Sequence, residues 1–334
     1  QYTVSTILAR SKRGHAGRLI LHSMSFLALC VAVLSLIYAL YLYLPGKPVT
    51  PSVHTAEDSV VFDDTPLSPV SQFYPHMKFN HNTITYTIGS GCDSAKRDRI
   101  HRAFSEMSAQ VSALSFQETQ GDSDIDIICT PGIKEKPGER AFIAGEGGAR
   151  GIIPTGRFHI ITEGLVYLYD DSKIRLTKVC EYPHVEVHEL MHVFGFNHSN
   201  DSRSVMYPLL RSCEQTLDAS IVLELNRLYA IENAPDLFFR NVSTVKRGIY
   251  LDFNLSIQNS GSIDARNISF SVFSEDKLIH HDYIDNLTFG SGVSMRATNL
   301  RLKERNPDDI RFVIDSDNSI SELDEGNNEA VVLL

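Results

Sequence analysis

The hydrophobic and polar positions change their period several times along the chain. Residues 19–44 are almost continuously apolar, and His22 is their one notable ionisable side chain. As a helix, a stretch of this length spans the roughly 30 Å of a bilayer. A cleaved signal peptide is the alternative, but its apolar part has about 7–15 residues and ends at a small-residue cleavage site. This stretch is longer and has no convincing A-x-A site, so we predict a transmembrane helix.

The sequences on either side of this helix predict its orientation. Residues 1–18 contain four basic residues and no acidic one. Basic flanks stay in the cytoplasm, which predicts a cytoplasmic tail and a single-pass cell-membrane protein whose remaining chain is extracytoplasmic. Residues 45–72 are rich in Pro and Ser without an apolar period, and we expect a linker there.

Strand-like and helix-like periods alternate between residues 73 and 234. Alternating polarity predicts strands at 83–88, 114–118, 124–129 and 158–162. A helical period predicts helices at 93–111 and 215–231, the second with Thr216 as a plausible N-cap. A third helix is expected to begin near Pro183. The glycine-rich residues 141–156 are not a phosphate loop, because no GK[ST] follows them.

The last hundred residues have a different pattern. Residues 248–261 alternate strictly, and residues 267–273 and 309–315 do the same. Turn-rich stretches separate these segments. Residues 236–334 are therefore predicted to form a β-sandwich.

Composition narrows the classes of function. Apolar residues make up 43% and charged residues 22%, as in an ordinary folded protein, and the net charge is −10. This charge argues against nucleic acid as a partner. Six N-x-[ST] sequons suit an extracellular chain. The sequence does not indicate an oligomeric state.

The chemistry is concentrated in HELMHVFGFNH, residues 188–198. His188 and His192 are four residues apart and lie on one face of a helix, where both can bind one ion. Gly195 can end the helix with a positive φ and turn the chain back, so that His198 supplies a third nitrogen. Three nitrogens leave one tetrahedral position for water, as in a catalytic zinc site. The alternative is an amphipathic helix with ordinary histidines.

The full pattern HExxHxxGxxH, followed by Met-Tyr-Pro at 206–208, resembles the metzincin clan of zinc peptidases. Ser199 after the third His makes the matrixin family the closest resemblance. The resemblance implies one catalytic Zn²⁺ held by the three histidines, and protein or peptide substrates. It also implies that Glu189 is the general base towards the zinc-bound water and that Met206 lies beneath the imidazoles.

The same resemblance assigns weaker roles. Tyr207 and Pro208 are expected to begin the wall of a substrate pocket, and residues 141–156 to supply an edge strand over the cleft. His159 lacks the companions of a structural zinc ligand, so we expect an ordinary strand histidine. No PRCGVPD motif precedes the domain, so latency by a cysteine switch is not expected. A different metal, copper or nickel, is an alternative that affinity alone does not exclude.

Four of the five cysteines follow the predicted membrane helix, and four cysteines allow three pairings. We favour Cys92–Cys129, which would join the start of a helix to the end of a strand. Cys180–Cys213 would then hold the start of the active-site helix to the segment after Met206. Four free thiols are the alternative. A glycan on Asn197 would crowd the histidines, so we expect that sequon to be unused.

The C-terminal sequence DSDNSISELDEGNNEA resembles the CARDB type of immunoglobulin-like module. Four of its acids are candidates for binding calcium: Asp315, Asp317, Glu322 and Glu325. Their spacing lacks the glycine of an EF-hand loop, so calcium is possible but unsupported, and a solvated turn is favoured.

Together these patterns predict one transmembrane helix, an α+β metzincin domain with a mixed sheet and three helices at 73–234, and an all-β immunoglobulin-like sandwich. The predicted function is a membrane-anchored zinc endopeptidase that cleaves extracytoplasmic proteins. The alternative is a catalytically degenerate surface adhesion protein that binds through the sandwich. All three histidines and Glu189 are present, which favours the enzyme.

Overall fold

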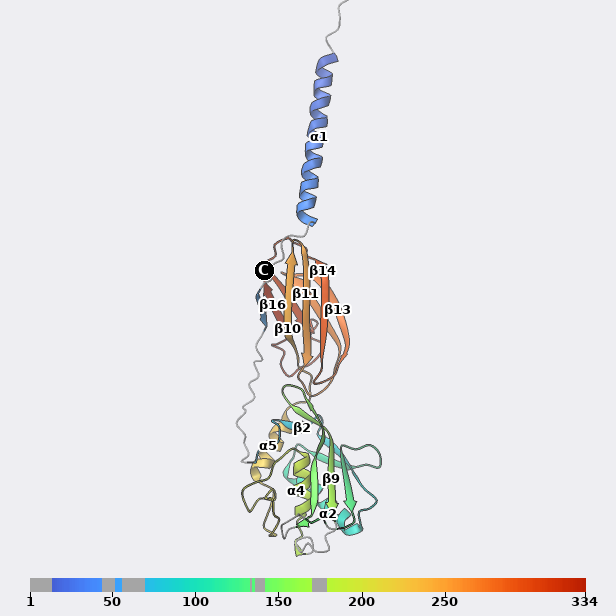
Figure 1. Cartoon of the computed structure of the whole chain (residues 1–334), viewed down its shortest axis with the longest axis vertical. Coiled ribbons are helices and arrows are strands. Elements are labelled where there is room, and N and C mark those ends of the chain that lie inside the picture. Colours follow the sequence, from blue (N-terminus) through green and yellow to red (C-terminus); the bar gives the residue numbers. More distant parts are fainter. Residues whose placement is uncertain (1–13, 44–51, 56–69, 133, 136–141, 170–178) are drawn as a thin grey trace, which may run out of the picture.

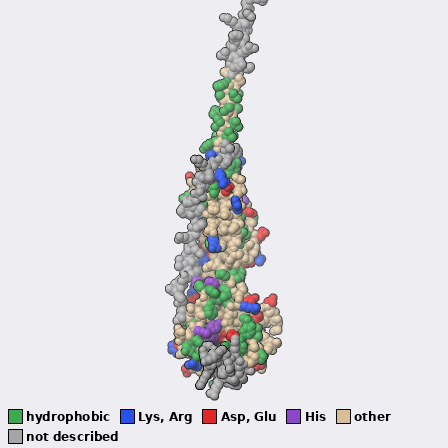
Figure 2. All heavy atoms as spheres, viewed as in Figure 1, with side chains coloured by type: hydrophobic (Ala, Val, Ile, Leu, Met, Phe, Trp, Pro, Cys, Tyr) green, Lys and Arg blue, Asp and Glu red, His purple; other side chains and the backbone are tan. Residues whose placement is uncertain are grey.

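The computed structural model describes residues 14–43, 52–55, 70–132, 134–135, 142–169 and 179–334. Helix α1, Gly14–Tyr43, begins five residues before the predicted start. Its segment Ser23–Tyr41 is long and apolar enough to cross a membrane, and none of it is buried inside the protein. Figure 2 shows these exposed apolar side chains as a continuous column.

The central unit, residues 70–234, is built on one mixed sheet. Four parallel pairings give the order β2-β9-β5-β3-β4, and β8 pairs antiparallel with β9. The strands are β2 Met77–Phe79, β3 Thr83–Ile88, β4 Ser115–Glu118, β5 Ile125–Thr130, β8 Gly145–Pro154 and β9 His159–Tyr169. Two short strands, β6 Lys134–Glu135 and β7 Phe142–Ile143, pair separately. Among the described residues β8 has no partner other than β9, so it is the edge strand expected from the glycine-rich segment.

Three described helices complete this unit: α2 Ser94–Gln110, α4 His184–Val193 and α5 Ala219–Ala230. The helical period of α2 buries Ile100, Phe104 and Met107 in the core. Asp93 caps α2, because its carboxylate accepts a hydrogen bond from the amide of Lys96 at 2.8 Å. The predicted mixed sheet with three helices is confirmed.

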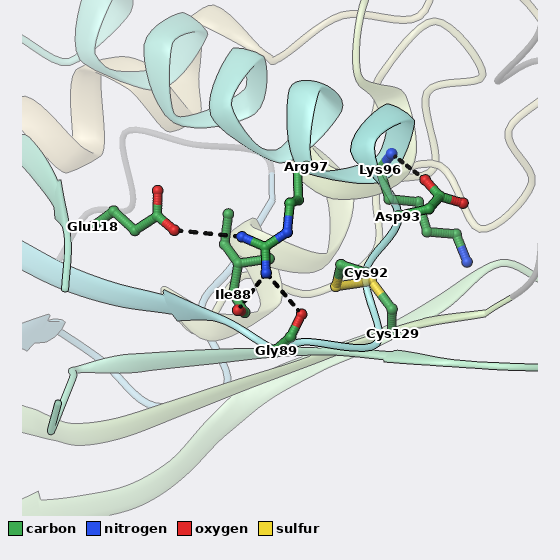
Figure 3. The surroundings of a disulfide bond; sticks show 8 residues. All are labelled: Ile88, Gly89, Cys92, Asp93, Lys96, Arg97, Glu118 and Cys129. Atoms are coloured by element: carbon green, nitrogen blue, oxygen red, sulfur yellow. Dashed lines mark hydrogen bonds and ion pairs between the residues drawn. A yellow bond between two sulfur atoms is a disulfide. The ribbon is translucent and has the colours of Figure 1, made fainter. Parts of the chain in front are cut away.

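Two disulfides join segments that are distant in the sequence. Cys92–Cys129 holds the start of α2 to the end of β5. Beside it, Arg97 donates to the carbonyls of Ile88 and Gly89 at 3.1 Å (Figure 3). Cys180–Cys213 joins the segment before α4 to the segment before α5. Both pairings are those favoured from the sequence.

The expected cap of the last helix is wrong. Helix α5 begins at Ala219, with Asp218 as its N-cap residue. Thr216, three residues before Ala219, forms a β-bridge instead. The backbone of Thr216 pairs with the segment around Ser204, and its carbonyl accepts from the amide of Val205 at 2.8 Å. Because of this pairing Thr216 is not helical, and the helix begins further along the chain.

The C-terminal sandwich consists of two antiparallel sheets, as predicted. One sheet has the order β10-β11-β14 and the other has the order β1-β16-β15-β12-β13. The strands are β10 Leu237–Arg247, β11 Tyr250–Asn259, β12 Ala265–Ser274, β13 Lys277–Leu287, β14 Gly292–Arg301, β15 Asp309–Ile314 and β16 Glu329–Leu333. The alternating residues Leu251, Phe253, Leu255 and Ile257 are buried between the sheets.

The first strand of this sandwich comes from the segment expected to be a linker. Strand β1, Ser52–Thr55, pairs antiparallel with β16, with Val53 opposite Val332. The chain therefore contributes to the C-terminal sandwich before it forms the central unit. Figure 1 shows the sandwich between α1 and the central unit.

Candidate metal centre

The end of α4 determines where the third histidine lies. Helix α4 carries His188 and His192 one turn apart, and it ends at Val193. Gly195 has φ +86°, and a Cβ there would lie 2.3 Å from the sulfur of Met77. Only glycine fits both the positive φ and the close approach of Met77. The chain turns back at this residue, and His198 comes beside His192.

The three imidazoles converge through their Nε2 atoms. Nε2 of His192 lies 3.2 Å from Nε2 of His188 and 3.3 Å from Nε2 of His198. A tetrahedral zinc bound at about 2.0–2.1 Å places its ligand nitrogens about 3.3–3.4 Å apart. The observed separations therefore fit three nitrogens that share one ion.

Backbone carbonyls fix the tautomer of two of these rings. Nδ1 of His188 lies 2.6 Å from the carbonyl of Val205, and Nδ1 of His192 lies 2.7 Å from the carbonyl of Phe196. A carbonyl can only accept, so Nδ1 carries the proton in both rings and the Nε2 lone pair is free for a metal. Burial lowers the pKa of His188 to about 4 and also lowers that of His192, which keeps both rings neutral.

The segment around Met206 is held against the histidines by its backbone. The amide of Ser199 donates to the carbonyl of Met206 at 2.8 Å, one residue after the third histidine. Val205 accepts from His188, as described above. The Met206 side chain is fully buried. The turn is thus fixed to the segments that carry the first and third histidines.

Glu189 is buried beside His188, with 6% of its surface exposed. Strand β8 packs directly against it: a Cβ on Gly145 would lie 2.7 Å from Cγ of Glu189, and one on Gly147 would lie 2.1 Å from its carbonyl oxygen. Burial, with a smaller contribution from Glu146, raises the pKa of Glu189 to about 8, and a backbone hydrogen bond from Gly147 opposes this rise. A carboxyl group with such a pKa can accept and return a proton near neutral pH.

Comparison with known families agrees with this geometry. Residues 78–230 match the family model Matrixin, and residues 234–332 match the family model CARDB. The chain contains a matrixin domain followed by a CARDB domain. The central unit is the matrixin domain, and the C-terminal sandwich is the CARDB domain.

The relatives of the matrixin domain are metalloproteinases by name. Matrix metalloproteinase-C of Caenorhabditis elegans is 31% identical over 166 residues, covering 47% of this chain and 27% of that protein. Metalloendoproteinase 1 of Glycine max is 32% identical over 165 residues, covering 47% of this chain and 53% of that protein. The chain thus spans about half or less of the length of these relatives.

A solved CARDB domain was also found. It belongs to a Pyrococcus furiosus protein and was crystallised in complex with di-metal ions. The identity is 17% and the TM-score 0.24, over 30% of this chain and 91% of that chain.

A short segment at the start of the matrixin domain supports the histidine loop from its other side. Gln72 forms a β-bridge with Phe196, and its side chain donates to the carbonyl of Phe194 at 2.9 Å. The amide of Phe73 donates to the carbonyl of Gly195 at 2.7 Å, and its exposed ring lies 6.2 Å from that of His192. Gln72 was expected in the linker and Phe73 at the edge of the catalytic unit, because no local signal reveals a partner some 120 positions away.

The remaining expected residues do not supply atoms to the cluster of three imidazoles. Tyr207 is half-buried and Pro208 is exposed, in the turn that follows Met206. His159 begins β9, where its ring stacks on Tyr74 and its Nδ1 lies 2.8 Å from the carbonyl of Pro75. It is an ordinary strand histidine, as expected.

The CARDB domain brings three of the four acids considered for calcium together. Oxygens of Asp315, Glu322 and Glu325 lie within 4.8 Å of one another. Asp315 already accepts hydrogen bonds from the amides of Ser319 and Ile320, at 3.1 and 2.9 Å. Asp317 accepts instead from the hydroxyl of Ser269 at 2.6 Å. These acids thus accept hydrogen bonds both from their own turn and from the neighbouring strands β10 and β12.

Proposed function

We propose that this chain is a membrane-anchored zinc endopeptidase that hydrolyses peptide bonds in extracytoplasmic proteins. The observation that carries the proposal is the convergence of three imidazoles at tetrahedral spacing beside the buried carboxyl group of Glu189. In this assignment His188, His192 and His198 hold one zinc ion. The metalloproteinase names of the relatives support the same class of reaction.

A bound zinc ion would supply a Lewis acid that polarises the scissile carbonyl and acidifies water. Glu189 accepts the proton of the attacking water and delivers it to the leaving amine. Its burial keeps bulk water away from this proton, and the wall formed by Gly145 and Gly147 limits where the carboxyl group can lie. Met206 and the carbonyls of Val205 and Phe196 orient the imidazoles. Tyr207 and Pro208 would line one side of the substrate pocket.

The location of the enzyme is part of the proposal. The apolar helix α1 supports a membrane anchor, and the two disulfides suit an oxidising compartment. The basic residues before α1 favour a cytoplasmic N-terminal side, which places both domains outside.

The deciding experiment is Glu189→Gln in the soluble chain from residue 45 onward. The amide cannot accept the proton, so cleavage of a peptide library should fall roughly 10²–10⁴-fold while one zinc per chain is retained. Glu163→Gln, an exposed glutamate on β9, is the matched control and should cleave normally. Normal cleavage by Glu189→Gln, or wild-type cleavage that survives complete removal of the metal, would contradict the proposal.

A further inference from the structure

The turn between β8 and β9, residues 155–158, projects from the matrixin domain and contacts the CARDB domain. The hydroxyl of Thr155 donates to the carbonyl of Ser260 at 2.8 Å. Gly156 has φ +112°, and a Cβ there would lie 3.4 Å from the side chain of Ser260. On the CARDB side, a Cβ on Gly290 would lie 2.9 Å from the carbonyl of Pro154. The two backbones are therefore in direct contact.

Arg157, at the tip of this turn, is buried between two carboxylates of the CARDB domain. It pairs through Nε with Asp236, and its Nη2 lies 3.6 Å from Asp324. The Asp236 side chain has no exposed surface, and it also accepts hydrogen bonds from Asn327 at 3.1 Å and from Ser260. A buried cation of the matrixin domain thus lies against two anions of the CARDB domain inside the interface.

This buried ion pair favours one arrangement of the two domains. If the turn shifted within the closed interface, Arg157 and Asp236 would each lose the partner of its charge while still shielded from water, which is strongly unfavourable. Domains joined by a short linker otherwise move relative to one another by default. The pair therefore fixes the β8–β9 turn at one position on the CARDB domain.

The other end of β8 forms the wall beside Glu189. Gly145 and Gly147 contact Glu189, and Ile153 and Pro154, at the far end of the same strand, contact the CARDB domain. One edge of β8 pairs with β9, and the other has no partner among the described residues. A free edge of this kind can bind an extended peptide by adding it as a strand.

We propose that Arg157 is a positioning residue through which the CARDB domain fixes strand β8. Fixing β8 also fixes its free edge, where the substrate backbone would bind, and the glycines that pack against Glu189. The CARDB domain is then a structural part of the peptidase rather than an independent adhesion module. This inference rests on the proposed function, because it assigns β8 to the binding of the substrate backbone.

The test compares Arg157→Met with Arg157→Lys and Arg247→Met in the full chain. Arg247 pairs with Asp252 at a more exposed position of the CARDB domain, so its variant removes an Arg–Asp pair away from the interface. In Arg157→Met we expect faster hydrogen exchange of the amides of residues 145–153. We also expect a KM that rises roughly tenfold or more for peptides long enough to lie along β8, with a smaller change for short peptides. Arg157→Lys should recover part of both effects, and Arg247→Met should show neither.

Unchanged hydrogen exchange in β8, or an equal rise in KM for long and short peptides, would overturn the role of Arg157. If Arg157→Met does not fold, Asp324→Asn is used instead. It removes the carboxylate that lies farther from Arg157, and it is judged by the same measurements. The exchange experiment needs no activity. A wild-type chain that cleaves nothing would therefore end the proposed function, while exchange in β8 would still decide the coupling between the domains.

Discussion

Three glycines of β8 show how one residue type serves different purposes within a single strand. Gly145 and Gly147 leave room for Glu189, whereas a Cβ on Gly148 would meet nothing within 4 Å. At Gly145 the nearest atoms belong to the Glu189 side chain, which can move; at Gly147 they belong to the backbone of α4, which cannot. A methyl group at Gly145 should therefore displace the carboxyl group without disrupting the fold.

Gly145→Ala should lower the rate of peptide cleavage far more than it lowers stability. Its Cβ would lie 2.9 Å from Oε1 of Glu189, so the carboxyl group must shift. A displacement of about 1 Å can cost about 10²-fold in rate, while overpacking of this kind costs about 1–3 kcal/mol of stability. The measurements are kcat/KM and the unfolding midpoint. Gly148→Ala is the control on the same strand, and equal activity of the two variants would contradict this account.

Elements with a local cause could be predicted from the sequence. The amphipathic period of α2 and the break at Gly195 both appear in the structure, because each depends on residues within one or two turns. The Thr216 cap failed because Thr216 pairs with the distant segment around Ser204. The bridge of Gln72 and the strand β1 were missed for the same reason. Local propensity does not contain a partner that only the tertiary fold brings near.

Lys78, in the short strand β2, shows how two elements are joined by a buried charge. Its side chain is fully buried, and Nζ donates to the last carbonyls of the α5 region, Leu228 at 3.0 Å and Ile231 at 3.3 Å. A positive charge is favourable at a helix C-terminus. The rings of Phe158 and Tyr229 face the same ammonium group, at 5.5 and 5.3 Å. Burial nevertheless lowers the pKa of Lys78 to about 8.

This pKa predicts a pH dependence of stability. Between pH 8 and 10.5 the unfolded chain keeps the Lys78 proton while the folded chain releases it, so the free energy of unfolding should rise with pH. The contribution is at most about 1.4 kcal/mol per pH unit. Lys78→Met should lack this contribution. In denaturant titrations the free energy of unfolding of the wild type should therefore rise relative to that of Lys78→Met from pH 8 to 9.5. Lys303→Met, at an exposed position, should follow wild type; parallel curves for wild type and Lys78→Met would refute the assignment.

The CARDB domain contacts a segment that precedes the matrixin domain in the sequence and a turn inside that domain. Strand β1 precedes that domain in the sequence and pairs with β16, the last strand of the chain. Arg157 joins the matrixin domain to the other end of the sandwich. Without β1, β16 would be an open sheet edge, which proteins generally cover. The segment after the proposed anchor therefore completes the sandwich, and the sandwich separates the matrixin domain from α1 (Figure 1).

Proline substitutions in β1 test this arrangement at the backbone. In an antiparallel pair, neighbouring residues direct their amides to opposite sides, so only one of Val53 and His54 can donate to β16. Proline at that residue removes a hydrogen bond worth about 1 kcal/mol and should speed hydrogen exchange of the amides of residues 329–333. Proline at the other residue is the built-in control and should have a much smaller effect. Equal exchange in both variants and in wild type would mean that β1 does not pair with β16 in solution. The sandwich would then end at β16, and the anchor would be joined to the matrixin domain by a free tether.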